Sequence, residues 1–343
     1  MSIPSDTPAS GASTTDLAKV TPEDKPTFGQ KLKTHLRRWW WAYLLAFICI
    51  VLIVILPVVY VGVPHIANDY INKYQFDLDG LTISNPQPTA FHVSQSQKIS
   101  MNGFSGSGQL STFNASLNTA DNQEFAVLQV PEIDLKDGGS ISIDHDLHLT
   151  CVDCFSQVLT SAATDNNVSV LLKGKPDLKI GSLPTAHLNI HNMMKMKGYN
   201  FTDLANTPGA INITSLSLLN PPVNGYNFNA TITLHNPTLF VVEMGHIIFN
   251  LTIGNSSAGF FDLPNLVLAQ NTSSTEVLGQ VDETMLVEQA VLSADGFGII
   301  TVGIQGYSCD YNGQDIPYFT AAIKAVSVSA KVNLLQYAAS LFS

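Results

Sequence analysis

Apolar and polar residues alternate with a period of two along most of the chain beyond residue 64. In the segment 141–150, Ile141, Ile143, Leu147 and Leu149 alternate with polar side chains. Successive side chains of a strand point to opposite faces, so this pattern predicts a strand with one buried face. The same pattern predicts further strands at 228–234, 247–253, 298–304 and 326–334.

Turn-forming residues separate these runs, and few segments have the spacing of a helix. Asp137-Gly138-Gly139 and Asn224-Gly225 are two such turns. Many short strands joined by turns predict a mainly β protein, and about 280 residues are enough for two domains of typical size. The predicted fold is therefore two tandem immunoglobulin-like β-sandwich domains. We expect helices only at 155–164, 201–205, 285–292 and in the C-terminal tail.

One segment breaks the alternation, because the 25 residues from Trp39 to Val63 contain no charged side chain. As a helix this segment is about 37 Å long, which is enough to cross the hydrocarbon core of a bilayer, about 30 Å thick. It predicts one N-terminal transmembrane helix at 39–63. The tail before it, residues 1–38, has few large apolar residues and should be disordered.

The charges beside the apolar segment predict its direction across the membrane. Lys31, Lys33, Arg37 and Arg38 precede it, so the positive-inside rule places the N-terminus in the cytosol and gives type II topology. A cleaved signal peptide is the alternative interpretation. Its apolar core would have only about 7–15 residues and would end at a small-residue cleavage site, and no such site follows Val63. We expect an uncleaved signal anchor.

The part of the chain beyond the anchor repeats one feature. Each half has an Asn-Pro pair at the end of a predicted strand, at Asn85-Pro86 and at Asn236-Pro237. Proline cannot donate a hydrogen bond to a strand ladder, so such a pair can end a strand and begin a turn. The repetition predicts a first luminal sandwich at 64–208 and a second at 209–343.

The predicted luminal part also carries N-x-[ST] sequons, which are acceptors for N-glycosylation. Glycans need exposed positions, so we expect these asparagines on loops or on outward strand faces. The eight sequons begin at Asn114, Asn167, Asn200, Asn212, Asn229, Asn250, Asn255 and Asn271. They predict a glycoprotein in a compartment that glycosylates.

Three of the four cysteines, Cys151, Cys154 and Cys309, lie beyond the anchor. In an oxidising lumen we expect either a tight Cys151–Cys154 loop or a long-range disulfide from one of these two residues to Cys309. A thioredoxin-like redox site would require the C-x-x-C motif at the start of a helix in a βαβ unit. Here the motif follows a predicted strand.

Several histidines and carboxylates are candidate metal ligands by residue type. Alternation places Asp144, Asp146 and His148 on one strand face, about 7 Å apart in succession, which is loose for a single ion. A solvated strand face is the simpler interpretation. His187 and His191 would stand about 13 Å apart on a strand. The sequence therefore predicts no catalytic, metal or cofactor site.

The charge balance argues against two classes of partner. Residues 1–63 hold 4 of the 27 acidic and 6 of the 16 basic side chains, which leaves 23 acidic and 10 basic beyond the anchor. This excess of negative charge argues against binding of nucleic acid or anionic lipid through a broad basic surface. The methionine-rich segment 193–197 fits either a contact surface or a strand edge guarded by lysines.

A family resemblance rests on four segments of the second half. They are His235-Asn236-Pro237-Thr238, the predicted strand at 247–253, the Gly254-Asn255 turn and the run 265–281. On these residues the second half resembles the water-stress and late-embryogenesis-abundant type-2 family of β-sandwich domains. The whole plan is similar to fungal single-pass membrane proteins with tandem domains of this type. The resemblance implies an immunoglobulin-like fold and an endomembrane location, above all the vacuolar membrane. It carries over no catalytic residue.

These observations lead to two hypotheses about function. The first is a non-enzymatic type II membrane glycoprotein whose luminal domains serve as a binding, scaffolding or sensing module, with a luminal protein as partner. The alternative is a lipid-binding or lipid-transfer module at the membrane surface, and a luminal hydrolase comes third. The vacuolar membrane is the expected location, with the plasma membrane and extracellular domains as the alternative.

Overall fold

The computed structural model describes residues 44–45, 47–55, 58–73, 80–98, 108–135, 140–238, 240–292 and 296–337. The chain divides into two compact units, Met1–Pro57 and Val58–Ser343. The predicted cytosolic tail at 1–38 lies outside the described residues. The second unit is mainly β, with its strands gathered in sheets, which confirms the predicted fold class.

Among the described residues, one helix is long and apolar enough to cross a membrane. It runs from Phe47 to Asp69, 23 residues with a mean hydropathy of 2.8. The predicted span at 39–63 overlaps it, and the first residues of that prediction lie outside the described residues. The helical backbone continues past Val63, as the π-helical turn η1 (Val58–Gly62) and then α2 (Val63–Lys73). Hydropathy marks only the apolar part of such a helix, whereas α2 also carries the polar side chains of an amphipathic helix.

Two asparagines attach α2 to the segment that leads from β10 (Ala186–His187) into β11 (Ile190–Lys197). The side-chain oxygen of Asn68 accepts a hydrogen bond from the Asn189 amide at 2.6 Å. The side chain of Asn72 donates to the Asn189 carbonyl at 3.0 Å and accepts from the His191 amide at 2.7 Å. α2 is thereby fixed to backbone groups by its side-chain amides.

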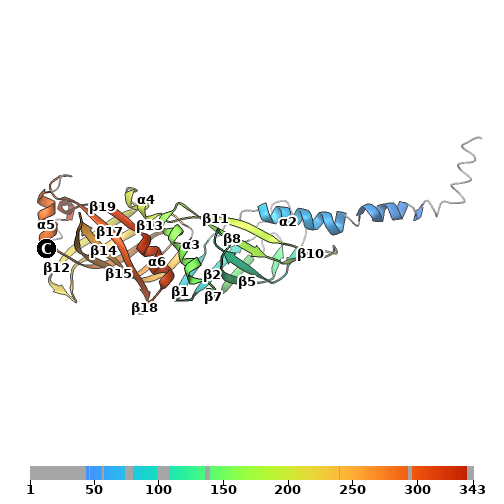
Figure 1. Ribbon diagram of the computed structural model, residues 1–343, viewed down its shortest axis with the longest axis horizontal. Helices are drawn as coiled ribbons and strands as arrows, with labels where there is room; N and C mark the ends of the chain where they lie inside the picture. Colours follow the sequence, from blue (N-terminus) through green and yellow to red (C-terminus); the bar gives the residue numbers. More distant parts are fainter. Residues whose placement is uncertain are drawn as a thin grey trace, which may run out of the picture. The chain divides into compact units, whose positions relative to one another are not determined.

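The largest sheet has eleven strands and runs through both halves of the chain (Figure 1). Three strands join it beside its main path: β17 (Ile299–Tyr311) pairs with β14, and β18 (Gln314–Asp315) and β19 (Ser327–Asn333) pair with β17. The main path follows the order β12 (Ile211–Val223), β13 (Tyr226–Asn236), β16 (Asn271–Val281), β15 (Ser256–Leu268), β14 (Val241–Ile253), β1 (Thr82–Gln87), β2 (Ala90–Lys98) and β7 (Ser140–His148).

Two smaller sheets of four strands each belong to the first half. One has the order β10, β9 (Asp177–Ile180), β3 (Gly108–Leu110) and β6 (Ile133–Leu135). The other has the order β11, β8 (Asn167–Gly174), β4 (Phe113–Asn118) and β5 (Glu124–Val130). β11 and β10 are therefore edge strands of these two sheets.

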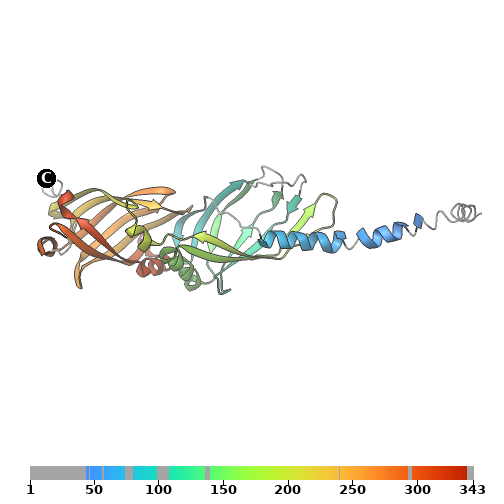
Figure 2. The same ribbon diagram turned by 90° about the horizontal axis from the view of Figure 1, so that it is seen from above.

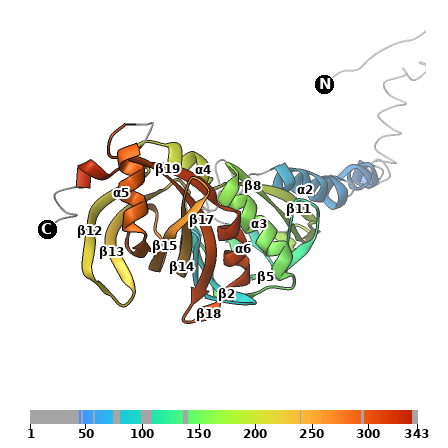
Figure 3. The same ribbon diagram turned by 60° about the vertical axis from the view of Figure 1, so that its left-hand side comes forward.

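Four helices accompany the sheets beyond α2 in the described part of the chain. α3 (Val152–Thr164), α4 (Phe201–Asn206) and α5 (Glu283–Leu292) fall where the sequence predicts helices. α6 (Pro317–Ala325) was not predicted, and the tail contains the short 3-10 turn η2 (Leu334–Tyr337). α3 and α6 lie side by side (Figure 3), between the strands of the first half and those of the second (Figure 2).

The two halves join through a short parallel pairing. Thr82 of β1 pairs with Val241 of β14, and Ile83 pairs with Val242. The main hydrophobic cluster draws buried side chains from both halves, among them Phe91 of the first. The predicted boundary at 208/209 falls just before β12 and stays a prediction, because the large sheet crosses it without interruption.

A candidate ligand-binding cavity

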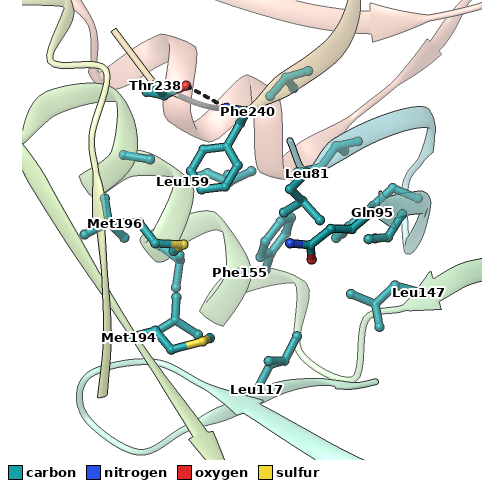
Figure 4. A pocket seen from close by; sticks show the side chains of 18 of the residues that line it. Leu81, Gln95, Leu117, Leu147, Phe155, Leu159, Met194, Met196, Thr238 and Phe240 are labelled. Atoms are coloured by element: carbon teal, nitrogen blue, oxygen red, sulfur yellow. Dashed lines mark hydrogen bonds between the residues drawn. The ribbon is translucent and has the colours of Figure 1, made fainter. Parts of the chain in front are cut away.

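An apolar cavity of about 380 Å³ lies inside the second unit, where the sheets and helices converge. Its walls come from β1, β2 and β7 of the large sheet, from β4, β5, β8 and β11, and from α3 and α6. Figure 4 shows side chains from both halves around the same space, with Leu81 and Leu147 on one side and Phe240 on another. The cavity is thus built jointly by residues that are far apart in the sequence.

Regular spacing explains how each element supplies apolar side chains to the wall. On α3, Phe155, Val158, Leu159 and Ala162 line the cavity, which is the i, i+3, i+4, i+7 spacing of one helix face. On β8, residues 168, 170 and 172 do so, which is the period of two of a strand. The apolar stripe of α3 is the signal that sequence reasoning could have used.

Two of the three methionines of β11, Met194 and Met196, also line the cavity. Met194 is buried, Met196 is half-buried, and both lie in the wall opposite Gln95 (Figure 4). Met193 and Lys195 on the same strand point outward and are exposed. β11 is an edge strand with exposed lysines, which is in keeping with the guarded-edge interpretation of segment 193–197, and the contact-surface interpretation stays a prediction. Methionine side chains are flexible and adapt to irregular apolar ligands.

The lining draws on two clusters of buried residues. Leu110, Val130 and Ile133 belong to a separate hydrophobic cluster, against which Ala67 of α2 packs. Phe91 of β2 and Met244 of β14 both belong to the main cluster. The cavity therefore reaches from the part of the unit beside α2 to the second half of the chain.

Few described lining residues carry polar groups. They are Gln95, Lys197, Tyr199, Asn236 and Thr238. The Asn236 amide is satisfied, because it donates to the Phe240 carbonyl at 2.8 Å and accepts from the Thr238 hydroxyl at 2.7 Å. Lys197 is exposed and marks a place where the lining reaches solvent.

Tyr199 differs from the other polar residues of the wall. It is 7% exposed, and its hydroxyl is a buried group without a hydrogen-bond partner among the described residues. Burial raises the pKa of this phenol well above its usual value, so the hydroxyl stays protonated. Ligand sites typically combine an apolar wall with a few polar groups that orient the ligand. This cavity has that composition.

The residues that the sequence analysis weighed as metal ligands lie elsewhere. Asp144 and Asp146 are exposed on the outer face of β7, as predicted. His92 of β2, which the sequence analysis did not single out, contacts both: Nδ1 lies 2.9 Å from Asp146 and Nε2 2.8 Å from Asp144. Asp146 first, and Asp144 after it, raise the pKa of His92 by accepting its hydrogen bonds.

No group of three or more histidines, cysteines or carboxylates in the described part of the chain is arranged to hold a metal ion. His187 instead contacts Asp177, with its Nδ1 at 2.6 Å from the carboxylate. His191 of β11 is exposed and donates its backbone amide to Asn72. These histidines have structural contacts at the surface.

The cysteines adopt the short-range pairing. Cys151 and Cys154 form a disulfide, and Cys309 is a buried free thiol. Burial raises the pKa of Cys309 to about 12. The C-x-x-C motif follows the strand β7, as the sequence predicts, and it also starts a helix, because Cys151 is the N-cap of α3. However, β7 and β8 on either side of α3 belong to different sheets, so no βαβ unit surrounds the motif.

The sequons are exposed with two exceptions. The asparagines at 114, 167, 212, 250, 255 and 271 are exposed, and Asn229 is half-buried. Asn200 is 9% exposed, which corrects the expectation that every sequon lies on an outward surface. Its side-chain oxygen caps α4 by accepting a hydrogen bond from the Asp203 amide at 3.1 Å. Helix capping accounts for this asparagine in the folded chain.

Fold and cavity define the class of protein: a mainly β protein with one apolar N-terminal helix and an internal apolar cavity. A family described as "Protein of unknown function (DUF3712)" matches residues 123–251, from the residue before β5 through most of β14. The matched segment crosses the predicted domain boundary. No curated protein matches the chain.

Solved structures with detectable similarity are distant. The periplasmic chaperone SfaE is 12% identical over 73% of this chain and 94% of its own, with a TM-score of 0.16. A putative β-galactosidase from Bacteroides fragilis is 10% identical over 74% of this chain and 34% of its own, with a TM-score of 0.18. The CupB2 chaperone of Pseudomonas aeruginosa is 9% identical over 71% of this chain and 92% of its own, with a TM-score of 0.14. Similarity at this level carries no argument about function.

Proposed function

We propose that this protein is a membrane-anchored, non-enzymatic lipid-binding module. The observation that supports the proposal is the apolar cavity of about 380 Å³. Its volume falls within the range of about 300–1,000 Å³ that is usual for small-molecule sites. Apolar walls exclude most polar ligands, because each unpaired polar group taken from water into such a site costs several kcal/mol. A hydrocarbon chain carries no such cost.

The size of the cavity favours a ligand over an empty interior. An apolar wall around an unfilled volume of about 380 Å³ lacks the dispersion contacts of a packed interior. A bound chain restores the lost contacts. For this reason we prefer lipid binding to scaffolding or sensing without a small ligand.

The contact between α2 and the sheets supports a role near a bilayer. The candidate membrane span ends at Asp69, within α2. In the same helix Ala67 packs against the cluster that contains Leu110 and Ile133, and both of these line the cavity. One end of the cavity therefore lies beside the helix that we propose leaves the membrane, and lipid exchange with that bilayer is part of the proposal.

Location, glycosylation and ancestry belong to the same proposal. The sequons favour a compartment that glycosylates, with the vacuolar membrane as the first choice and the plasma membrane as the alternative. The resemblance to fungal proteins with late-embryogenesis-abundant type-2 domains is in keeping with this choice. Imaging of the tagged protein, and a gel shift on treatment with an endoglycosidase, test both points.

Photolabelling tests the cavity directly. The full chain, in phosphatidylcholine nanodiscs, is mixed with a hexadecane analogue that carries a photoreactive diazirine. We expect peptide mass spectrometry to find the label on cavity residues such as Met194 and Leu159. The substitution Leu117→Trp should reduce this labelling about tenfold or more, because the indole occupies space that the chain needs.

The matched control is Val127→Trp. Val127 lies on β5, the neighbour of β4, and is 40% exposed outside the cavity. The substitution Val127→Trp should therefore leave the labelling of the cavity unchanged. Labelling confined to the anchor, or equal labelling of the wild type and of Leu117→Trp, would contradict lipid binding. Either result would favour the hypothesis of a scaffolding module.

A further inference from the structure

Tyr199 is held firmly in the wall of the cavity. Its backbone amide donates to the Ala162 carbonyl of α3 at 2.7 Å, and its ring packs on Phe201 with centroids 4.3 Å apart. Gly198 makes this close approach possible, since a Cβ atom there would lie 2.0 Å from the Asp165 carbonyl oxygen. The phenol is therefore fixed in place before any ligand binds.

The hydroxyl of Tyr199 nevertheless has no partner in the described part of the chain. A buried hydroxyl without a hydrogen bond costs about 1–3 kcal/mol. The same fold satisfies a comparable group elsewhere, since the fully buried Tyr318 donates to the Ala90 carbonyl at 3.2 Å. Unpaired buried groups of this kind are rare in folded proteins and call for a partner.

We propose that the cavity binds a single-chain lipid whose head-group oxygen accepts a hydrogen bond from Tyr199. This inference rests on the proposed lipid-binding function and names the ligand class. The volume of about 380 Å³ lies near the lower end of the usual range, which suits one chain. The acceptor is a carboxyl or hydroxyl oxygen at the end of that chain. The remaining wall, from α3, β8 and β11, surrounds the hydrocarbon.

The substitution Tyr199→Phe isolates this hydrogen bond. It keeps the ring and its packing on Phe201, and it removes only a hydroxyl that has no partner in the fold. The unliganded variant should therefore be at least as stable as the wild type. A merely structural tyrosine would show a loss of stability instead.

Competition measures the effect on ligand choice. The full chain in phosphatidylcholine nanodiscs is labelled with the photoreactive hexadecane analogue, and palmitate, hexadecanol or hexadecane is added as competitor. In Tyr199→Phe, palmitate and hexadecanol should compete about tenfold less well than in the wild type, which corresponds to about 1.4 kcal/mol. Hexadecane should compete equally in both. Each competitor partitions into the nanodisc lipid to the same extent with either protein, so partitioning does not affect the comparison of the two proteins.

The control is Tyr318→Phe, which removes a satisfied hydroxyl outside the cavity. It should lower the melting temperature and leave the order of the competitors unchanged. If the wild type labels in the cavity and Tyr199→Phe competes with palmitate as the wild type does, the Tyr199 inference is wrong while lipid binding stands. If the wild type shows no labelling in the cavity, the proposed function itself fails.

Discussion

His92 lies between two carboxylates on the outer face of the large sheet. It pairs with Asp146 across β2 and β7, and Asp144 stands two positions along the same strand. Both ring nitrogens contact a carboxylate, which favours the protonated imidazolium. The sequence alone predicted that Asp144 and Asp146 share an exposed face. It could not predict His92, because strand register across about 50 residues decides which side chain stands opposite.

His92 should titrate above its ordinary pKa of 6.5, mainly because of Asp146. A raised pKa in the folded state means that its stabilising contribution is complete below about pH 6.5 and is lost as the pH rises through the folded pKa. Titration of the ring signals by NMR checks this. Asp146→Asn should lower the pKa of His92. A folded pKa at or below 6.5 in the wild type would contradict the pairing.

At the scale of elements, α6 shows why some helices cannot be predicted from the sequence. It is short, begins with Pro317 and has no side-chain cap. Its buried residues lie on one face, but the opposite face has Ala321 and Ala325 beside Thr320 and Lys324. The polar stripe that marks a surface helix is therefore narrow. α3, by contrast, alternates apolar and polar positions at helical spacing and was predicted.

The close packing of α6 on β17 depends on Gly306. A Cβ atom at this position would lie 2.0 Å from the Ile323 carbonyl oxygen. Gly306→Ala should therefore destabilise the protein by at least about 1–3 kcal/mol, measured by chemical denaturation. The control is Gly108→Ala, where the nearest atoms lie at 3.5 Å, an ordinary contact. Equal stability of the two variants would mean that α6 does not pack as described.

At the scale of the whole molecule, aromatic rings join the two halves of the second unit. Phe155 of α3 stacks on Phe91 with centroids 5.1 Å apart, and its edge meets Tyr318 of α6 at 5.3 Å. The paired backbone at this junction is only two residues long in each strand. Side-chain packing therefore carries most of the connection between the halves.

We expect the two halves to unfold together. Phe155→Ala should lower the free energy of unfolding by about 3–5 kcal/mol. Hydrogen exchange should then speed up in β8 of the first half and in β17 of the second alike. Val127→Trp serves again as a surface control. Faster exchange in one half alone would show that the halves are independent, as the predicted boundary at 208/209 implies.

The cavity could not be predicted from the sequence, for a physical reason. Each strand and helix revealed which of its faces is apolar, as the alternation in β7 and β8 illustrates. An apolar face that borders a void has the same pattern as one packed against a neighbour. The room for a ligand depends on the spacing between α3, β11 and β14 in three dimensions. The role that we propose for Tyr199 depends on that cavity.

The attachment of α2 to the edge of β10 and β11 has a consequence for neighbouring copies. The asparagine amides of α2 occupy backbone groups at residues 189 and 191 that would otherwise be open to another strand. Exposed strand edges recruit one another and lead to aggregation. If the apolar helix anchors the chain in a bilayer, as proposed, copies share a surface and meet often. By occupying these backbone groups, α2 should then hinder the pairing of this edge with a neighbouring copy.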